Sequence, residues 1–334
     1  DPQFSNERGT NHLFGAGLVE LLAREMTADL QAQRQAALGQ ARTSGKPVEA
    51  SLVAKGVAFG KITAHPDGML DLSGIDGVDT DLVIRPFSQK GVMTSLRQFT
   101  VNALNHHHGI QASERFGTRW TGQDDFDEDG HADEFDTDQV SAITAWQATL
   151  EPPAERVPDD PRWREAAERG SQGFDALGCA ECHVRALPLA SLRFEDPGPY
   201  DAAGTLRRGD VPAFAVYDLA LRAWAERLER NEKGEVMVPL FGDLKRHVIA
   251  DQQVAHFGNE LLAQRFVGRN EFQTTELWGV ASTGPYGHRN DLTTIDEAIR
   301  AHGGAARKAR DQYVDLAEQE QRDLVAYLKT LVIK

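Results

Sequence analysis

The two cysteines of this 334-residue chain lie close together, in Cys179-Ala180-Glu181-Cys182-His183. Two thiols three positions apart on a helical turn can both reach the vinyl groups of one porphyrin, and a histidine directly after the second thiol lies beneath the iron. A zinc site would need a second pair of ligands, and no other cysteine exists to supply one. A redox dithiol would need a βαβ context, whereas predicted helices flank this motif. The pattern therefore predicts one covalent haem c, attached through Cys179 and Cys182, with His183 as an iron ligand.

The other axial ligand of the iron is not fixed by this motif. A methionine or a second histidine is usual in this position. Met237 follows the motif in Val-Met-Val-Pro, a setting that suits an apolar strand equally well. The histidines that follow the motif are also candidates: His247, His256, His288 and His302.

Four further segments follow the haem motif in an order that resembles the C-terminal haem domain of the di-haem oxidoreductase family. They are residues 243–247 (Asp-Leu-Lys-Arg-His), 276–280 (Glu-Leu-Trp-Gly-Val), 285–288 (Pro-Tyr-Gly-His) and 297–304 (Glu-Ala-Ile-Arg-Ala-His-Gly-Gly). This family is related to bacterial di-haem cytochrome c peroxidases and to the MauG-type enzyme that matures methylamine dehydrogenase. The likeness covers about residues 170–334, and residues 14–20 (Phe-Gly-Ala-Gly-Leu-Val-Glu) match the N-terminal half more weakly.

The resemblance implies that His302 is the distal ligand of the haem iron, opposite His183. The alternative for His302 is a polar helix terminus, where a cation meets the helix dipole. His288 is then expected in the haem pocket rather than on the metal, and His247 is the third choice as ligand. Arginines could pair with the haem propionates, because a guanidinium matches carboxylate geometry. The candidates are Arg265, Arg269 and Arg289.

The chain departs from the family pattern in two places. Family members ordinarily carry a second Cys-x-x-Cys-His motif in the N-terminal half, for the haem that reacts with peroxide, and this sequence has none. Where the family often reads Leu-His-Asp-Met-Gly, residues 246–250 read Arg-His-Val-Ile-Ala, so no methionine is offered. Either an upstream segment has been lost or the protein uses one c-type haem, and peroxidase activity is therefore in question.

An acidic loop at residues 125–136 has the spacing of a calcium-binding loop and resembles the loops of extracellular dockerin-type modules. Carboxylates fall at positions 1, 3 and 5, a glycine at 6, a backbone carbonyl at 7 and a carboxylate at 12. These positions are Asp125, Asp127, Asp129, Gly130, His131 and Asp136. The alternative is a solvated acidic loop that caps the following helix. We predict a structural calcium ion.

Three consecutive histidines, His106, His107 and His108, allow two interpretations. Such triplets can bind transition metals or approach a haem edge. A helix end with solvated imidazoles is the commoner arrangement, and we favour it here.

The predicted fold is mainly α. Prolines between residues 151 and 161 divide the chain into an N-terminal domain (1–155) and a cytochrome-c-like haem domain (156–334). The N-terminal domain should be α-rich, with a few short strands and the calcium-type loop. Helices are predicted near residues 18–30, 92–106, 137–146, 163–177, 216–229, 294–301 and 318–331, strands at 52–63 and 81–86, and a loop at 184–216.

The composition restricts the partners and the setting of the protein. A net charge of −15 excludes nucleic acid, whose phosphates would be repelled, and favours a basic redox protein as partner. No apolar run is long enough for a membrane helix. The chain begins with Asp1, as expected of a processed protein, and covalent haem suggests a periplasmic or secreted location. We predict electron transfer through a closed haem. The alternatives are a peroxidase or oxidase with an open or second haem, and a non-catalytic haem-bearing subunit.

Overall fold

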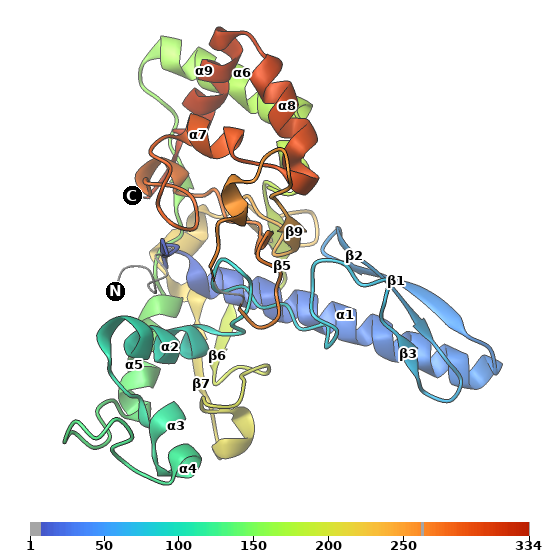
Figure 1. The fold of residues 1–334 in the computed structure, drawn as a ribbon, viewed down its shortest axis with the longest axis vertical. Helices are drawn as coiled ribbons and strands as arrows, with labels where there is room; N and C mark the ends of the chain where they lie inside the picture. Colours follow the sequence, from blue (N-terminus) through green and yellow to red (C-terminus); the bar gives the residue numbers. More distant parts are fainter. Residues whose placement is uncertain (1–7, 262–263, 334) are drawn as a thin grey trace.

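The computed structural model of the protein describes residues 8–261 and 264–333, so Asp1 lies outside the described residues. Figure 1 shows a lobe of C-terminal helices, a lobe of helices α2 to α5 with strands β6 and β7, and the long helix α1 between them. None of the helices in the described part of the chain is long and apolar enough to cross a membrane. The helices are α1 (Ala16–Ser44), α2 (Leu96–His108), α3 (Ser113–Phe116), α4 (Thr118–Thr121), α5 (Thr137–Ala148), α6 (Pro161–Ala176), α7 (Ile295–Arg300), α8 (Arg307–Asp315) and α9 (Glu318–Leu328).

Short antiparallel strands connect these helices. The strands are β1 (Val48–Ala54), β2 (Val57–Ala64), β3 (Leu70–Asp71), β4 (Ala154–Glu155), β5 (Leu187–Leu189), β6 (Arg193–Asp196), β7 (Ala215–Asp218), β8 (Val236–Val238), β9 (Arg246–Val248), β10 (Glu271–Gln273) and β11 (Leu331–Val332). Strands β1, β2 and β3 form one sheet, and the other pairs are β4 with β11, β5 with β8, β6 with β7 and β9 with β10. Most of these pairs join segments that are distant in sequence.

Helix α1 and the β1–β2–β3 sheet form an arm that extends from the body (Figure 1). The apolar side chains of α1 are buried along its first half, as the helical spacing predicts. Strands β1 and β2 are joined by Lys55 and Gly56, which both have positive φ, as a two-residue hairpin turn requires. The strand predicted at residues 52–63 is therefore a hairpin. The strand predicted at residues 81–86 is wrong: Arg85 binds Asp79 and Asp81 and holds this segment as a loop.

The C-terminal lobe is built on the crossing of α6 and α9. At the crossing Gly170 lies so close to α9 that a Cβ atom there would overlap the carbonyl of Asp323. Phe174, Tyr313 and Tyr327 are buried beside it. Because α6 runs directly into the segment that carries the two cysteines, this packing fixes where that segment begins.

The largest hydrophobic cluster contains residues from both sides of the predicted boundary at residue 155. Leu22, Met26 and Phe59 pack in one cluster with Leu189 and Trp278. The division into domains 1–155 and 156–334 stays a prediction. The observed fold mixes helices with many short strands, so a mainly α fold is only partly correct.

The structure differs from the predictions for the C-terminal half in three places. The helix expected at residues 216–229 is replaced by β7 and two short 3-10 segments, because β7 pairs with β6 and Asp218 caps the first 3-10 turn. Helix α8 was missed because its sequence, Arg-Lys-Ala-Arg-Asp-Gln-Tyr-Val-Asp, contains few apolar residues. The final helix also ends earlier than expected, at Leu328, and β11 follows it.

Candidate functional site

A cavity of about 480 Å³ lies where the cysteine segment meets the C-terminal lobe. Helix α6 ends at Ala176, and Gly178 adopts positive φ, which turns the chain into a 3-10 segment that begins at Cys179. Both cysteines are half-buried free thiols, and both line the cavity. Burial raises the pKa of the Cys179 thiol to about 11. The volume is in the usual range for a small-molecule or cofactor site.

His183 and His302 face each other across this cavity. Their ring centroids are 6.5 Å apart, with the ring planes inclined by 64°. The Nδ1 atom of His183 lies 3.2 Å from the carbonyl oxygen of Phe241, and Nδ1 of His302 lies 2.7 Å from that of Ala298. A carbonyl only accepts hydrogen bonds, so each Nδ1 carries the proton and each Nε2 is left as a potential metal ligand.

The separation of the two rings suits a single metal ion between them. An imidazole nitrogen binds a metal at about 2.0–2.1 Å. Since a ring centroid lies roughly one ångström beyond its nitrogen, two rings on opposite sides of one ion should have centroids about 6 Å apart. Burial and the neighbouring His302 lower the pKa of His183 to about 4, and burial lowers the pKa of His302. Both rings are therefore held in the neutral form that binds metals.

The position of His302 depends on the two glycines that follow it. Helix α7 ends at Arg300, and the amide of Gly303 donates to the carbonyl of Ile249 at 2.8 Å. Gly304 has positive φ, and a Cβ atom there would overlap the carbonyl oxygen of Val248. The chain therefore turns sharply against β9 directly after His302, which glycines permit because they have no side chain.

His288 lines the same cavity but differs from the facing pair. It is buried, its ring lies 4.6 Å from that of Phe272, and neither ring nitrogen has a hydrogen-bond partner among the described residues. Burial lowers its pKa to about 4. This placement agrees with a residue of the pocket rather than one of an axial pair.

The arginines considered for the haem propionates make other contacts. Arg289 donates to the carbonyl of Asn259, Arg269 to the carbonyl of Glu260, and Arg265 binds Asp79. None of them lines the described cavity, whereas Lys308 and Arg310 do. Sequence reasoning missed these two cations because α8 itself was not predicted.

The cavity also contains groups that gave no signal in the sequence. Glu276 lines it, and burial raises the pKa of this carboxyl to about 7. Residues 9–12 line one side of it, because the amide of Gly9 donates to the carbonyl of His288 at 2.8 Å and Nε2 of His12 lies 3.0 Å from the carbonyl oxygen of Trp278. These contacts join residues that are about 270 positions apart, which spacing in the sequence cannot reveal.

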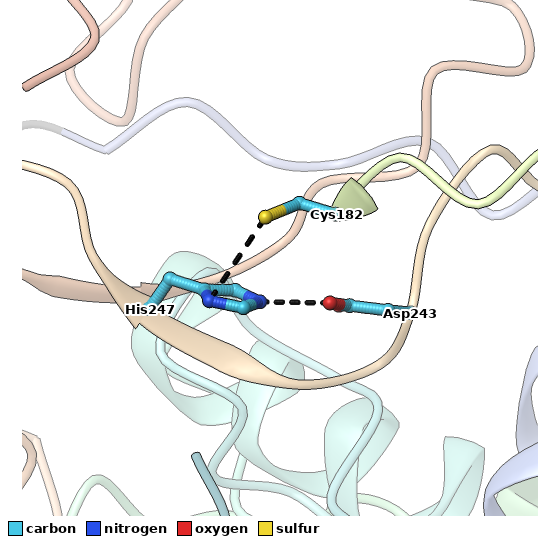
Figure 2. Close-up of side chains that lie close together, drawn as sticks. All are labelled: Cys182, Asp243 and His247. Carbon is cyan, nitrogen blue, oxygen red and sulfur yellow. Dashed lines mark hydrogen bonds and ion pairs between the residues drawn. The ribbon is translucent and has the colours of Figure 1, made fainter. Parts of the chain in front are cut away.

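His247 lies beside the second cysteine. Its Nδ1 atom is 4.0 Å from Sγ of Cys182, and its Nε2 atom is 2.7 Å from Oδ2 of Asp243 (Figure 2). Burial lowers the pKa of His247, but the hydrogen bond to Asp243 and the contact with Cys182 outweigh it and raise the pKa to about 10. Met237 is part of β8, where it pairs with Pro188.

The acidic loop brings three of its predicted calcium ligands together. Carboxylate oxygens of Asp125, Asp127 and Asp129 lie within 4.8 Å of one another. Gly130 has positive φ, and its amide donates to Oδ2 of Asp125 at 3.0 Å. Asp136 instead caps α5, with its side chain accepting from the amide of Gln139 at 2.8 Å.

The remaining predicted ligands lie apart from these groups. The amide of His131 donates to Asp129 at 2.9 Å, and its role as a carbonyl ligand stays a prediction. His106, His107 and His108 form the exposed last turn of α2, which Gly109 ends in a left-handed conformation. None of the three lines the cavity.

Comparison with known proteins identifies one curated relative. The chain is 32% identical over 209 residues to cytochrome-c peroxidase IdrP1 of Denitromonas iodatirespirans, covering 58% of this chain and 50% of the relative. The chain thus spans about half the length of this relative. No family model matches the chain. The expected resemblance to bacterial cytochrome c peroxidases is confirmed by this match.

Two solved structures are more distant. Hydrazine synthase of Kuenenia stuttgartiensis, pressurized with xenon, has a TM-score of 0.40 and 16% identity, covering 74% of this chain and 68% of its own. A MauG-like protein associated with microbial copper homeostasis has a TM-score of 0.38 and 15% identity, covering 98% and 93%. These scores are too low for either likeness to support an argument.

Proposed function

Because the chain is a relative of the bacterial cytochrome-c peroxidases, we propose that it is a c-type haem redox protein of the periplasm. Cys179 and Cys182 attach one haem c, and His183 and His302 bind its iron. The observation that carries this proposal is the pair of facing imidazoles, 6.5 Å apart, each held through Nδ1 by a backbone carbonyl.

The residues of the cavity favour electron transfer over reaction with peroxide. Bound there, the haem supplies a one-electron couple whose potential depends on its axial ligands. The two backbone-anchored histidines would both hold the iron, which would leave peroxide without a free place to bind it. The net charge of −15 favours a basic redox partner, drawn in by electrostatic attraction.

The spin state of the ferric protein tests this ligation. Two histidine ligands give a low-spin optical and EPR spectrum, and His302→Ala should convert it to a high-spin one. His288→Ala should change the spectrum much less, because His288 lies in the pocket. His65→Ala, in the turn after β2, is the control and should leave the spectrum as it is. A high-spin spectrum in the unmutated protein, or an unchanged one in His302→Ala, contradicts the proposal.

A peroxidase is the second candidate, because the relative carries that name. Glu276 and His288 would supply the acid–base groups such a reaction needs, since both line the cavity. This function requires an open coordination position or a second haem. Peroxide turnover by the unmutated protein, together with a high-spin spectrum, would favour it over electron transfer.

We propose in addition that the loop at residues 125–136 binds calcium. Its support is the convergence of Asp125, Asp127 and Asp129, with an oxygen of Asp125 that is buried without a partner among the described residues. Hard carboxylate oxygens should select calcium over zinc. The site would be structural, because it lies at the start of α5 and outside the cavity.

Paired substitutions test the calcium site. Asp127→Asn with Asp129→Asn should abolish calcium binding in calorimetry and remove the rise in melting temperature on calcium addition, while the haem spectrum stays unchanged. Asp133→Asn with Asp138→Asn changes the charge equally nearby and should retain binding. If the unmutated protein gains no thermal stability from calcium and contains none by elemental analysis, the loop is only acidic surface.

A further inference from the structure

Lys90 is buried, and all of its hydrogen-bond partners in the described part of the chain are neutral carbonyl groups. Only 1% of this residue is exposed. Its Nζ atom donates to the backbone carbonyls of Gly268 at 2.8 Å, Arg269 at 2.9 Å and Glu271 at 2.7 Å. The same atom lies 3.4 Å from the centroid of the Phe272 ring. Three carbonyl oxygens use every N–H of an ammonium group, and the face of an aromatic ring attracts a cation, so this cage favours the charged form of the lysine.

The charged groups around Lys90 leave its positive charge without a counterion. Burial lowers the pKa of Lys90 to about 8, so the ammonium is still protonated at neutral pH. Glu260 and Glu271 act to raise this pKa, whereas Arg8 and Arg269 act to lower it. The neighbouring acids are thus matched by neighbouring bases, and Glu260 pairs directly with Arg8 at 3.2 Å. The charge of Lys90 therefore remains as the net charge of this region.

A single aromatic ring separates this charge from the cavity. Phe272 lies on β10 and lines the cavity, and its ring centroid is 4.6 Å from that of His288, which lines the cavity as well. Gln89, the residue before Lys90, is another lining residue, and its carbonyl accepts from the amide of Gln273 at 3.0 Å. The ammonium is therefore held beside the cavity and away from water, where charges are screened much less than at the surface.

We propose that Lys90 raises the reduction potential of the haem in the cavity. This inference rests on the proposed function, because it needs that haem. Reduction adds one electron, and with it one negative charge, to the site. A fixed cation beside the site stabilises the more negative, reduced state, and the potential rises as a result. Loss of the charge of Lys90 should therefore lower the potential.

The alternative is that Lys90 only holds the turn at residues 268–271 in place. Two neutral substitutions separate these roles. Lys90→Gln and Lys90→Met both remove the charge, but only glutamine can donate to the carbonyls of the turn. The melting temperature should therefore be lower in Lys90→Met than in Lys90→Gln. The potential should fall by the same amount in both, because both have lost the same charge.

The control variant is Lys61→Met, which removes an equal charge far from the cage. Lys61 is an exposed residue of β2, in the arm that extends from the body (Figure 1), and it pairs with Glu49 at 2.7 Å. The measurement is a redox titration of the full haem-bearing chain, followed by haem absorbance. The melting temperature and the ferric spectrum are measured on the same samples, and they show whether each variant keeps its fold and its iron ligands.

A unit charge that acts across roughly 10 Å of protein should change a one-charge equilibrium by on the order of tenfold. We expect both Lys90 variants to lower the equilibrium constant for reduction by this factor, which corresponds to about 59 mV for one electron. Lys61→Met should leave the potential as it is. Lys90→Gln keeps donors for the turn, so this variant decides the test if Lys90→Met does not fold.

The proposal fails if Lys90→Gln retains the ferric spectrum and the potential of the unmutated protein. It fails equally if the potential follows the melting temperature, with a shift in Lys90→Met and none in Lys90→Gln, because Lys90 would then have only a structural role. An unmutated protein without covalent haem, or with a high-spin ferric spectrum, contradicts the proposed function instead.

Discussion

Substitution of Gly170 by alanine tests whether the crossing of α6 and α9 is as close as the structure has it. A Cβ atom at this position would overlap the carbonyl of Asp323 and lie 2.9 Å from Cβ of Tyr327. Backbone atoms cannot rotate away, so the helices must separate. Gly173 lies one turn later in the same helix, where an added Cβ atom meets nothing within 4 Å. Gly173→Ala is therefore the matched control.

The expected magnitude follows from comparing the two variants. Replacing glycine by alanine inside a helix stabilises it by about 0.8–1.0 kcal/mol, and this gain is common to both. The difference in their free energies of unfolding therefore isolates the overlap at Gly170, which should cost about 1–3 kcal/mol, the usual range for overpacking. We expect Gly173→Ala to be slightly more stable than the unmutated protein and Gly170→Ala less stable.

Urea unfolding, followed by circular dichroism and by haem absorbance, measures this difference. All three proteins should carry the same amount of haem, because a bound cofactor adds to apparent stability. If the three proteins have the same dependence of unfolding free energy on urea, their urea concentrations at half unfolding can be compared directly. This comparison avoids the error of extrapolating the free energy to water. Gly170→Ala and Gly173→Ala with the same midpoint would show that the helices do not cross at Gly170.

Two further predictions concern charged residues away from the cavity. Arg97 is buried between Glu114 and Asp196, so Arg97→Met should lower the free energy of unfolding by about 3–5 kcal/mol, measured by urea denaturation. Backbone amides and Arg307 hold the pKa of the Asp251 carboxyl well below its usual range. A carboxyl whose pKa is lower in the folded protein than in the unfolded chain, where it is about 3.9, stabilises the fold fully above the unfolded-state pKa. This stabilisation is lost as the pH falls through the folded-state pKa. Asp251→Asn should therefore flatten the decline of melting temperature below about pH 4.

Features that depend on neighbouring residues could be predicted from the sequence. The helix after the acidic loop begins at Thr137 as expected, because Asp136 and Gln139 form a reciprocal cap. Thr294 and Glu297 form the same cap on α7, and Gly109 ends α2 in a left-handed turn. In each case the residues that decide the structure are within a few positions of one another.

Features that depend on distant contacts could not be predicted in this way. Residues 216–229 have an apolar pattern that suits a helix, but pairing with Arg193–Asp196 makes their first part a strand. His247 was considered as an iron ligand, yet Asp243 and Cys182 occupy its two nitrogens. The spacing of four residues between Asp243 and His247 is visible in the sequence, but the position of Cys182 beside them is not.

The placement of His302 opposite His183 depends both on neighbouring residues and on contacts that are distant in the sequence. Spacing left several histidines open as the second ligand, and only the resemblance to di-haem oxidoreductases singled out His302. The structure shows how His302 comes to line the cavity: Gly304 can lie against Val248 because it lacks a side chain, and this contact fixes the end of α7. Its role as a ligand stays a prediction. Neither the amino-acid composition nor the helical spacing of apolar residues indicates that the turn at Gly303 and Gly304 lies against β9. The position of His302 depends on packing between β9 and the turn after α7, so it is encoded in two segments whose proximity only the folded chain reveals.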